Sequence, residues 1–164
     1  MDMPNERLNR IILHETYRTC LRKTAEYEKD RLFCKHDMSH FLDVARIGML
    51  LNIQESYGIE PELVYAAALL HDIGRWKQYE TGADHAQESA KLAPPILETC
   101  AFTREEQECI LSAIATHRDA SVRDQKNLNG LLYRADKSSR PCFFCEQEKA
   151  CNWKEGKKNL SLCI

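Results

Sequence analysis

The sequence predicts an all-α fold, and three observations support this prediction. The chain has 164 residues, enough for one domain of ordinary size with a short extension. It contains only six glycines and five prolines, and no run of alternating β-branched residues. Apolar residues recur instead at helical spacing along most of the chain. A hydrophobic content of 43% with 29% charged residues is typical of packed globular proteins and excludes a disordered chain.

The first half of the chain predicts three helices. Pro4 and Pro61 suit helix starts, because proline lacks the N–H that a first turn leaves unbonded. Gly58 suits the position after a helix end. The expected helices run from Pro4 through Thr24, from Met38 to Tyr57, and from Pro61 to near Gly74.

The second half predicts shorter helices. The pair Pro94-Pro95 is expected to stop one helix and start another, since a proline ring clashes with the preceding turn. Thr103 and Glu106 form a capping box at the start of a further helix. The expected elements are a loop over 79–84, helices over 85–93 and 95–101, a helix reaching His117, a polar connection over 119–127 and a helix over 128–138.

The domain organisation and location follow from composition. Residues 1–140 are expected to form one helical domain, with a leading helix in residues 1–32 packed on it, and 141–164 a cysteine-containing extension. The first ten residues are polar and the longest apolar run is Leu63–Leu70, so no secretory leader or membrane span is expected. A net charge of −2 indicates no general attraction to nucleic acid. These features predict a cytoplasmic protein, in which clustered Cys and His favour metal over disulfides.

Several polar residues lie on apolar helical faces. His40, for example, shares a face with Val44 and Ile47. A single inward histidine is usually a hydrogen-bonded core residue, but a buried aspartate costs several kcal/mol without a cation or donors. The inward-facing set is His40, His71 with the adjacent Asp72, His117 and Asp136. Because all of them can converge on one ion inside a helical bundle, we expect a divalent transition metal such as Mn, Fe, Co, Zn or Ni.

The order of these residues resembles a known family. His40 in HFLDV, His71-Asp72 in AALLHDIGR and Asp136 in YRADK match the H…HD…D signature of HD-domain metal-dependent phosphohydrolases, over residues 33–140. The resemblance implies a compact HD-type bundle with a metal site between helices, in which these four residues hold the ion.

Two more histidines match the binuclear subset of that family, H…HD…H…H…D. They are His85 in DHAQESA and His117 in AIATHR. The resemblance implies one or two ions, with Asp72 bridging and these two histidines on the second ion. A helix-capping role for His85 stays open as an alternative. His36, on the flank of its stripe, is interpreted at most as a neighbour of the ligands, and His14 as a surface residue.

The resemblance implies hydrolysis of a phosphoester or phosphoanhydride by metal-activated water. The expected partner is a small phosphorylated molecule, of nucleotide type. Asp72 is the central catalytic residue, and Arg75 and Lys137 are candidates to bind phosphate oxygens because of their places beside the ligands. Arg118 and Arg140 are secondary candidates. The HDIGR sequence is similar to the binuclear phosphodiesterase and dinucleoside-polyphosphate hydrolase branch, and lacks acidic residues typical of the nucleotidase and guanosine tetraphosphate hydrolase branches.

Two other functions stay open. Mixed-valent diiron oxygenases similar to inositol oxygenase use the same ligand order, and a non-catalytic nucleotide- or redox-sensing HD module would keep the scaffold. Cys142, Cys145 and Cys151 form a C-x2-C-x5-C arrangement that suits Zn or an iron–sulfur group but lacks a clear fourth ligand. Reduced or redox-active thiols in an extension are the alternative, and a homo-oligomer also stays open.

Overall fold

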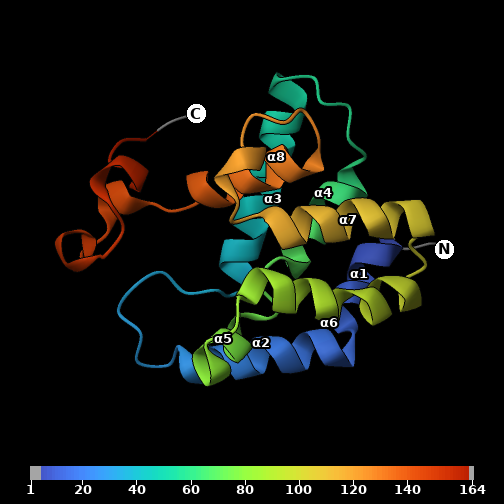
Figure 1. Cartoon of the computed structure of the whole chain (residues 1–164), viewed down its shortest axis with the longest axis horizontal. Coiled ribbons are helices and arrows are strands. Elements are labelled where there is room, and N and C mark those ends of the chain that lie inside the picture. Colours follow the sequence, from blue (N-terminus) through green and yellow to red (C-terminus); the bar gives the residue numbers. More distant parts are fainter. Residues whose placement is uncertain (1–4, 163–164) are drawn as a thin grey trace.

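The computed structural model describes residues 5–162 as a bundle of α-helices followed by short 3-10 turns (Figure 1). The α-helices are α1 (Glu6–Leu13), α2 (Glu15–Tyr27), α3 (Met38–Gln54), α4 (Pro61–Leu70), α5 (Arg75–Thr81), α6 (His85–Thr99), α7 (Arg104–Thr116) and α8 (Leu128–Ser138). The 3-10 turns are η1 (Ala120–Val122), η2 (Cys142–Phe144), η3 (Glu148–Ala150) and η4 (Glu155–Lys157). No strand occurs in residues 5–162, and the predicted all-α class is confirmed.

Helix α4 lies at the centre of the bundle. It is apolar on nearly all sides, and Val64 and residues 66–70 are buried. Its three consecutive alanines allow neighbouring helices to approach closely, and α1, α3, α7 and α8 all pack against it. Helix α4 has 10 residues, and no helix within residues 5–162 is long and apolar enough to cross a membrane.

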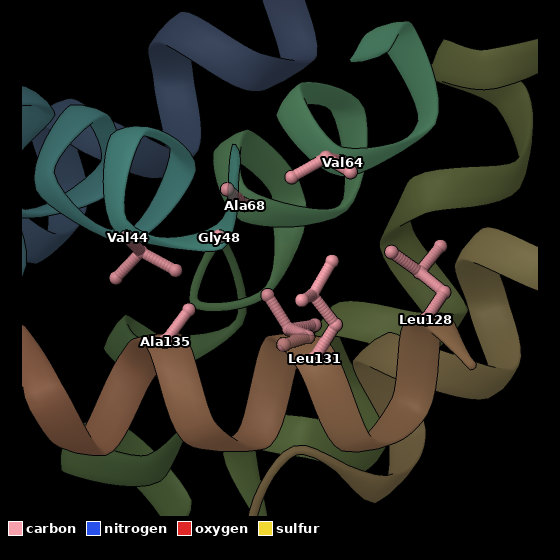
Figure 2. A pocket seen from close by; sticks show the side chains of 8 residues that line it. Val44, Gly48, Val64, Ala68, Leu128, Leu131 and Ala135 are labelled. Atoms are coloured by element: carbon pink, nitrogen blue, oxygen red, sulfur yellow. The ribbon is translucent and has the colours of Figure 1, made fainter. Parts of the chain in front are cut away.

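Helices α3, α4 and α8 meet in a tight apolar contact. Figure 2 shows Leu131 and Ala135 of α8 pointing toward Gly48 of α3 and Val64 and Ala68 of α4. The contact leaves no space for a water molecule. A Cβ at Gly48 would lie 3.0 Å from Val64 Cγ1, so glycine permits this approach of the helices. The contact fixes α3 and α8 relative to α4. Residues of the candidate site lie on α3, on α8 and directly after the end of α4.

The first predicted helix is wrong in one respect, because the chain breaks at His14. This residue has extended backbone (φ −63°, ψ 130°), and its Nδ1 accepts a hydrogen bond from Thr16 N at 3.2 Å. The bend lets α1 pack on α4 while α2 packs on α5. His14 is therefore a helix cap instead of a simple surface residue, and Pro4 lies outside the described residues.

The predicted break at Pro94-Pro95 is also wrong. One helix, α6, runs through both prolines from His85 to Thr99. Each internal proline costs about 3 kcal/mol by propensity. Buried Ala93, Ile96 and Leu97 flank the prolines, and α6 packs along α7. We attribute the continuity of α6 to this burial, which offsets the cost of the prolines.

The remaining predictions need smaller corrections. The predicted loop over 79–84 is helical as far as Thr81, where α5 ends before Gly82 (φ +76°). The predicted helix over 38–57 ends at Gln54. The capping box of Thr103 and Glu106 is confirmed, and so is the last helix over 128–138.

Gly130→Ala is expected to destabilise the fold by about 2 kcal/mol and to lower Tm by roughly 4–8 °C. A Cβ at Gly130 would lie 2.1 Å from Gln125 O and 2.8 Å from Val122 O, and both are backbone atoms, so the segment before α8 or α8 itself would have to shift. Calorimetry measures the shift. Gly156→Ala is the matched control, because a Cβ there meets nothing within 4 Å. Equal Tm values for the two variants would contradict the assigned packing.

Candidate metal centre

The structure brings all six sequence-predicted ligands to one buried point between the helices. Three of them lie at helix ends. His71 directly follows α4, His117 directly follows α7, and His85 is the first residue of α6. The others lie on α3 and α8 and in the turn after α4. Groups of their ligand atoms within 4.8 Å of one another are His40–His71–Asp72, His71–His117–Asp136 and Asp72–His85–His117.

The Asp72 carboxylate lies in the middle of this cluster. Its Oδ2 is 3.2 Å from His71 Nε2 and 3.7 Å from His40 Nε2. Its Oδ1 is 3.1 Å from His85 Nε2 and 3.5 Å from His117 Nε2. The two carboxylate oxygens therefore face two different pairs of imidazoles.

Asp136 lies on the same side of Asp72 as the imidazoles of His40 and His71. Its Oδ1 is 3.4 Å from His40 Nε2 and 3.7 Å from His71 Nε2. Its other oxygen, Oδ2, accepts a hydrogen bond from Lys137 Nζ at 2.5 Å. One carboxylate oxygen thus remains directed at the imidazoles while Lys137 engages the other.

A close backbone contact positions the turn that carries Asp72. Gly74 N donates to Ser89 Oγ of α6 at 2.9 Å. A Cβ on Gly74 would lie 2.5 Å from Ser89 N, so only glycine allows the turn to approach α6 this closely. The same helix begins at His85, whose start is capped by Asp84, and the contact therefore fixes Asp72 relative to His85.

The imidazoles share one orientation, in which Nδ1 has a hydrogen-bond partner and Nε2 faces the carboxylates. His71 Nδ1 donates to Ala68 O and His117 Nδ1 to Ile114 O, each at 2.7 Å. Because Nδ1 donates, Nε2 is the nitrogen that offers its lone pair to a metal once any proton on it has been displaced.

The other two imidazoles also have polar partners at Nδ1. His85 Nδ1 lies 2.6 Å from Gln78 Oε1 and 2.9 Å from Arg75 Nη1. His40 Nδ1 lies 3.4 Å from Ser139 Oγ, a hydroxyl that itself donates to Asp136 O. Hydrogen bonds at Nδ1 of this kind fix ring orientation and raise ligand basicity.

Unpartnered buried atoms test whether a metal fits here. His71 Nε2 and Asp72 Oδ1 are buried without a hydrogen-bond partner among the described residues. Such atoms cost free energy unless something satisfies them. A divalent ion meets this requirement, and mixed nitrogen and oxygen donors suit transition metals. The residues present therefore fit a metal centre.

Electrostatics also indicates a site built for positive charge. Burial raises the pKa of Asp72, but the surrounding imidazoles, above all that of His71, outweigh burial and hold the pKa well below its usual range. Burial lowers the pKa of His71, yet Asp72 and Asp136 raise it to about 10. In the absence of another cation, a proton on the imidazole balances the two carboxylates.

The sequence-predicted cations Arg75 and Lys137 both border the centre. Arg75 Nη1 lies 2.9 Å from His85 Nδ1, and its Nε donates to Tyr79 Oη at 3.2 Å. Lys137 contacts Asp136 as described above. Arg118 instead lies at the surface and pairs with exposed Asp84 at 2.6 Å.

Arg140 and His36 are closer to the centre than the sequence indicated. Arg140 is buried, with Nη2 3.2 Å from His40 Nε2. His36 is buried too, and its Nε2 lies 3.9 Å from Asp72 Oδ2. Glu28, which hydrogen-bonds His36, was missed altogether. These residues lie outside regular helices or at helix ends, where periodicity carries little signal. The sequence hinted at His36 through its spacing from His40 and at Arg140 through its place one turn after Asp136, but gave no hint of Glu28.

The cysteines of the extension are separate from this centre. Cys142, Cys145 and Cys151 are free thiols, and within residues 5–162 the groups able to hold a metal contain none of them. The extension lies beside the end of α8 (Figure 1), where Asn159 Nδ2 donates to the carbonyls of Lys137 and Arg140 at 2.8 Å. A metal or redox role for these thiols stays a prediction.

Comparison with known proteins supports one family. The HD domain family model matches residues 38–140. An uncharacterized protein from Clostridium beijerinckii is 43% identical over 157 residues, which cover 96% of this chain and 98% of that protein. The crystal structure of a predicted HD superfamily hydrolase from an uncultured Thermotogales bacterium has a similar fold, with a TM-score of 0.64 and 24% identity over 88% of this chain and 80% of that one. From the family match and the arrangement of its His and Asp residues, the chain belongs to the HD domain family.

Proposed function

We propose that this protein is a metal-dependent hydrolase of phosphoesters or phosphoanhydrides, acting on a small phosphorylated molecule of nucleotide type. The observation that carries the proposal is the position of Asp72, whose two oxygens face separate pairs of imidazoles. A carboxylate in this position can bridge two ions. Paired divalent ions suit in-line displacement at phosphorus, because they stabilise both the attacking and the leaving oxygen.

The proposed reaction assigns separate roles to the metal ligands and to the cationic side chains of the site. A bound divalent ion supplies Lewis-acid activation of water and of a phosphoryl oxygen. Asp72 would hold the metal through its carboxylate and is therefore not available as a free general base. Arg75, held by Tyr79 and beside His85, and Lys137, beside Asp136, offer positive charge to the remaining phosphate oxygens.

Metal analysis combined with an activity screen tests this function. The protein is purified without added metal, in air and anaerobically, and its metal-to-protein ratio is measured. Hydrolysis of nucleotides, dinucleoside polyphosphates and simple phosphoesters is then followed with Mn²⁺ or Co²⁺ by chromatography of the products together with inorganic phosphate. We expect metal-stimulated hydrolysis of at least one of these classes. Two irons with oxygen uptake and no hydrolysis would establish the oxygenase instead, and nucleotide binding without turnover would establish a sensing module.

His85→Ala is expected to lose the ion on the Asp72 Oδ1 side preferentially. His85 Nε2 is 3.1 Å from that oxygen, whereas the Oδ2 side keeps His40 and His71. The affinity for the ion on the Oδ1 side should fall at least about 100-fold, since removing even a residue that supports a ligand costs roughly 10–100-fold. Elemental analysis after dialysis measures this. His14→Asn, which keeps a helix-capping side chain, is the control. Retention of two ions by His85→Ala would exclude His85 as a required ligand.

A further inference from the structure

The segment between α2 and α3 contributes a fifth buried imidazole to the centre. His36 Nδ1 hydrogen-bonds Glu28 Oε1, and His36 N donates to Glu28 Oε2 at 2.7 Å. Tyr79 Oη of α5 also donates to Glu28 Oε1 at 2.7 Å. Glu28 and His36 are only 2% and 8% exposed, respectively. Two protein donors in addition to the ring therefore fix the carboxylate that orients His36.

His36 repeats the arrangement of the four sequence-predicted imidazole ligands. Its Nδ1 is occupied by a hydrogen bond, and its Nε2 lies 3.9 Å from Asp72 Oδ2. Its ring meets that of His40 edge-on, with centroids 5.8 Å apart. Asp72 Oδ2 is consequently faced by three imidazoles, those of His36, His40 and His71.

The geometry of the pair fits a ligand. Both the backbone N–H and the ring Nδ1 of His36 meet the Glu28 carboxylate, and Tyr79 Oη donates to the same carboxylate. An ionised carboxylate accepts Nδ1–H and leaves the lone pair on Nε2. A carboxylate–histidine pair of this kind commonly supports a metal ligand.

We propose that His36 is an additional metal ligand on the Oδ2 side of Asp72, and that Glu28 is its positioning residue. This inference rests on the proposed metal centre. Two lone pairs separated by 3.9 Å make no hydrogen bond with each other, but both can reach one ion, since such ligand bonds are about 2.0–2.2 Å long. An added imidazole favours transition ions such as Co²⁺, Zn²⁺, Fe²⁺ or Mn²⁺ over Mg²⁺ or Ca²⁺.

Titration of the metal-free, full-length protein with Co²⁺ tests this inference. The visible absorption of bound Co²⁺ reports its ligands, and calorimetry reports its affinity. His36→Ala is expected to weaken one ion by at least about 100-fold and to change the Co²⁺ spectrum. Glu28→Gln, which keeps an acceptor but removes the charge, is expected to weaken the same ion roughly tenfold. His14→Asn should stay within about twofold of wild type in affinity.

The outcomes separate this inference from the proposed function. A wild-type protein that binds no Co²⁺ would overturn both. Normal Co²⁺ binding by wild type, with the same affinity and spectrum in His36→Ala, would overturn the ligand role of His36 alone. If His36→Ala does not fold by circular dichroism, His36→Gln and Glu28→Gln decide the question, and wild-type affinity and spectra in both would equally overturn the inference.

Discussion

Asp72→Ala is expected to abolish binding of both ions and to reduce activity by at least about 10³-fold, equivalent to roughly 4 kcal/mol of transition-state stabilisation. Within residues 5–162, Asp72 is the residue whose oxygens face both pairs of imidazoles, so its loss removes a ligand from each of the two proposed ions. Elemental analysis and the hydrolysis assay measure the two effects.

Two further variants make this result interpretable. Asp72→Asn keeps the side-chain volume and removes the charge, and we expect it to behave like Asp72→Ala. Asp43→Ala replaces an exposed aspartate of α3 and should leave metal content and activity unchanged within about twofold. An active, metal-loaded Asp72→Ala protein would refute the assignment of the centre.

Removal of the metal by a chelator is expected to eliminate activity, and added Mn²⁺ or Co²⁺ to restore it. Metal uptake should also release protons, because Asp72 and Asp136 raise the pKa of His71 to about 10 despite its burial, so that its ring is protonated in the metal-free protein at about pH 8. An ion replaces that proton. Calorimetry in buffers of different ionisation enthalpy measures the release. Full activity after chelation, or uptake without proton release, would contradict this account.

The raised pKa of His71 also makes the folding stability of the metal-free protein depend on pH. The folded pKa of His71 lies above its unfolded value of 6.5. The stability that His71 contributes is therefore fully present below about pH 6.5 and is lost as the pH rises through about 10. Denaturation of the chelated protein across this range is the corresponding measurement.

The sequence determined the fold class and the inward positions of the main site residues. The reason is that hydrophobic periodicity is a local property, and His40 and Asp136 show their direction through neighbours one and two turns away. Local sequence signals gave wrong predictions at two places: a helix break at Pro94-Pro95 that does not occur, and an unbroken first helix where the chain breaks at His14. Local propensity there competes with packing on α7 and α4, and partner helices cannot be read from a local pattern.

Only the tertiary structure decided which side chains outside the periodic helices reach the centre. His36 lies in a connecting segment, Glu28 at the end of α2 and Arg140 beyond α8, so spacing gave at most their neighbourhood and not their contacts with the centre. Their positions depend on long-range contacts, such as Tyr79 with Glu28 and Arg140 with Lys35 O. The sequence thus determined a helical bundle with inward His and Asp residues. Packing between segments distant in sequence decided how these His and Asp side chains are arranged around Asp72. The reason is that hydrogen bonds between distant segments form only after the helices have packed together.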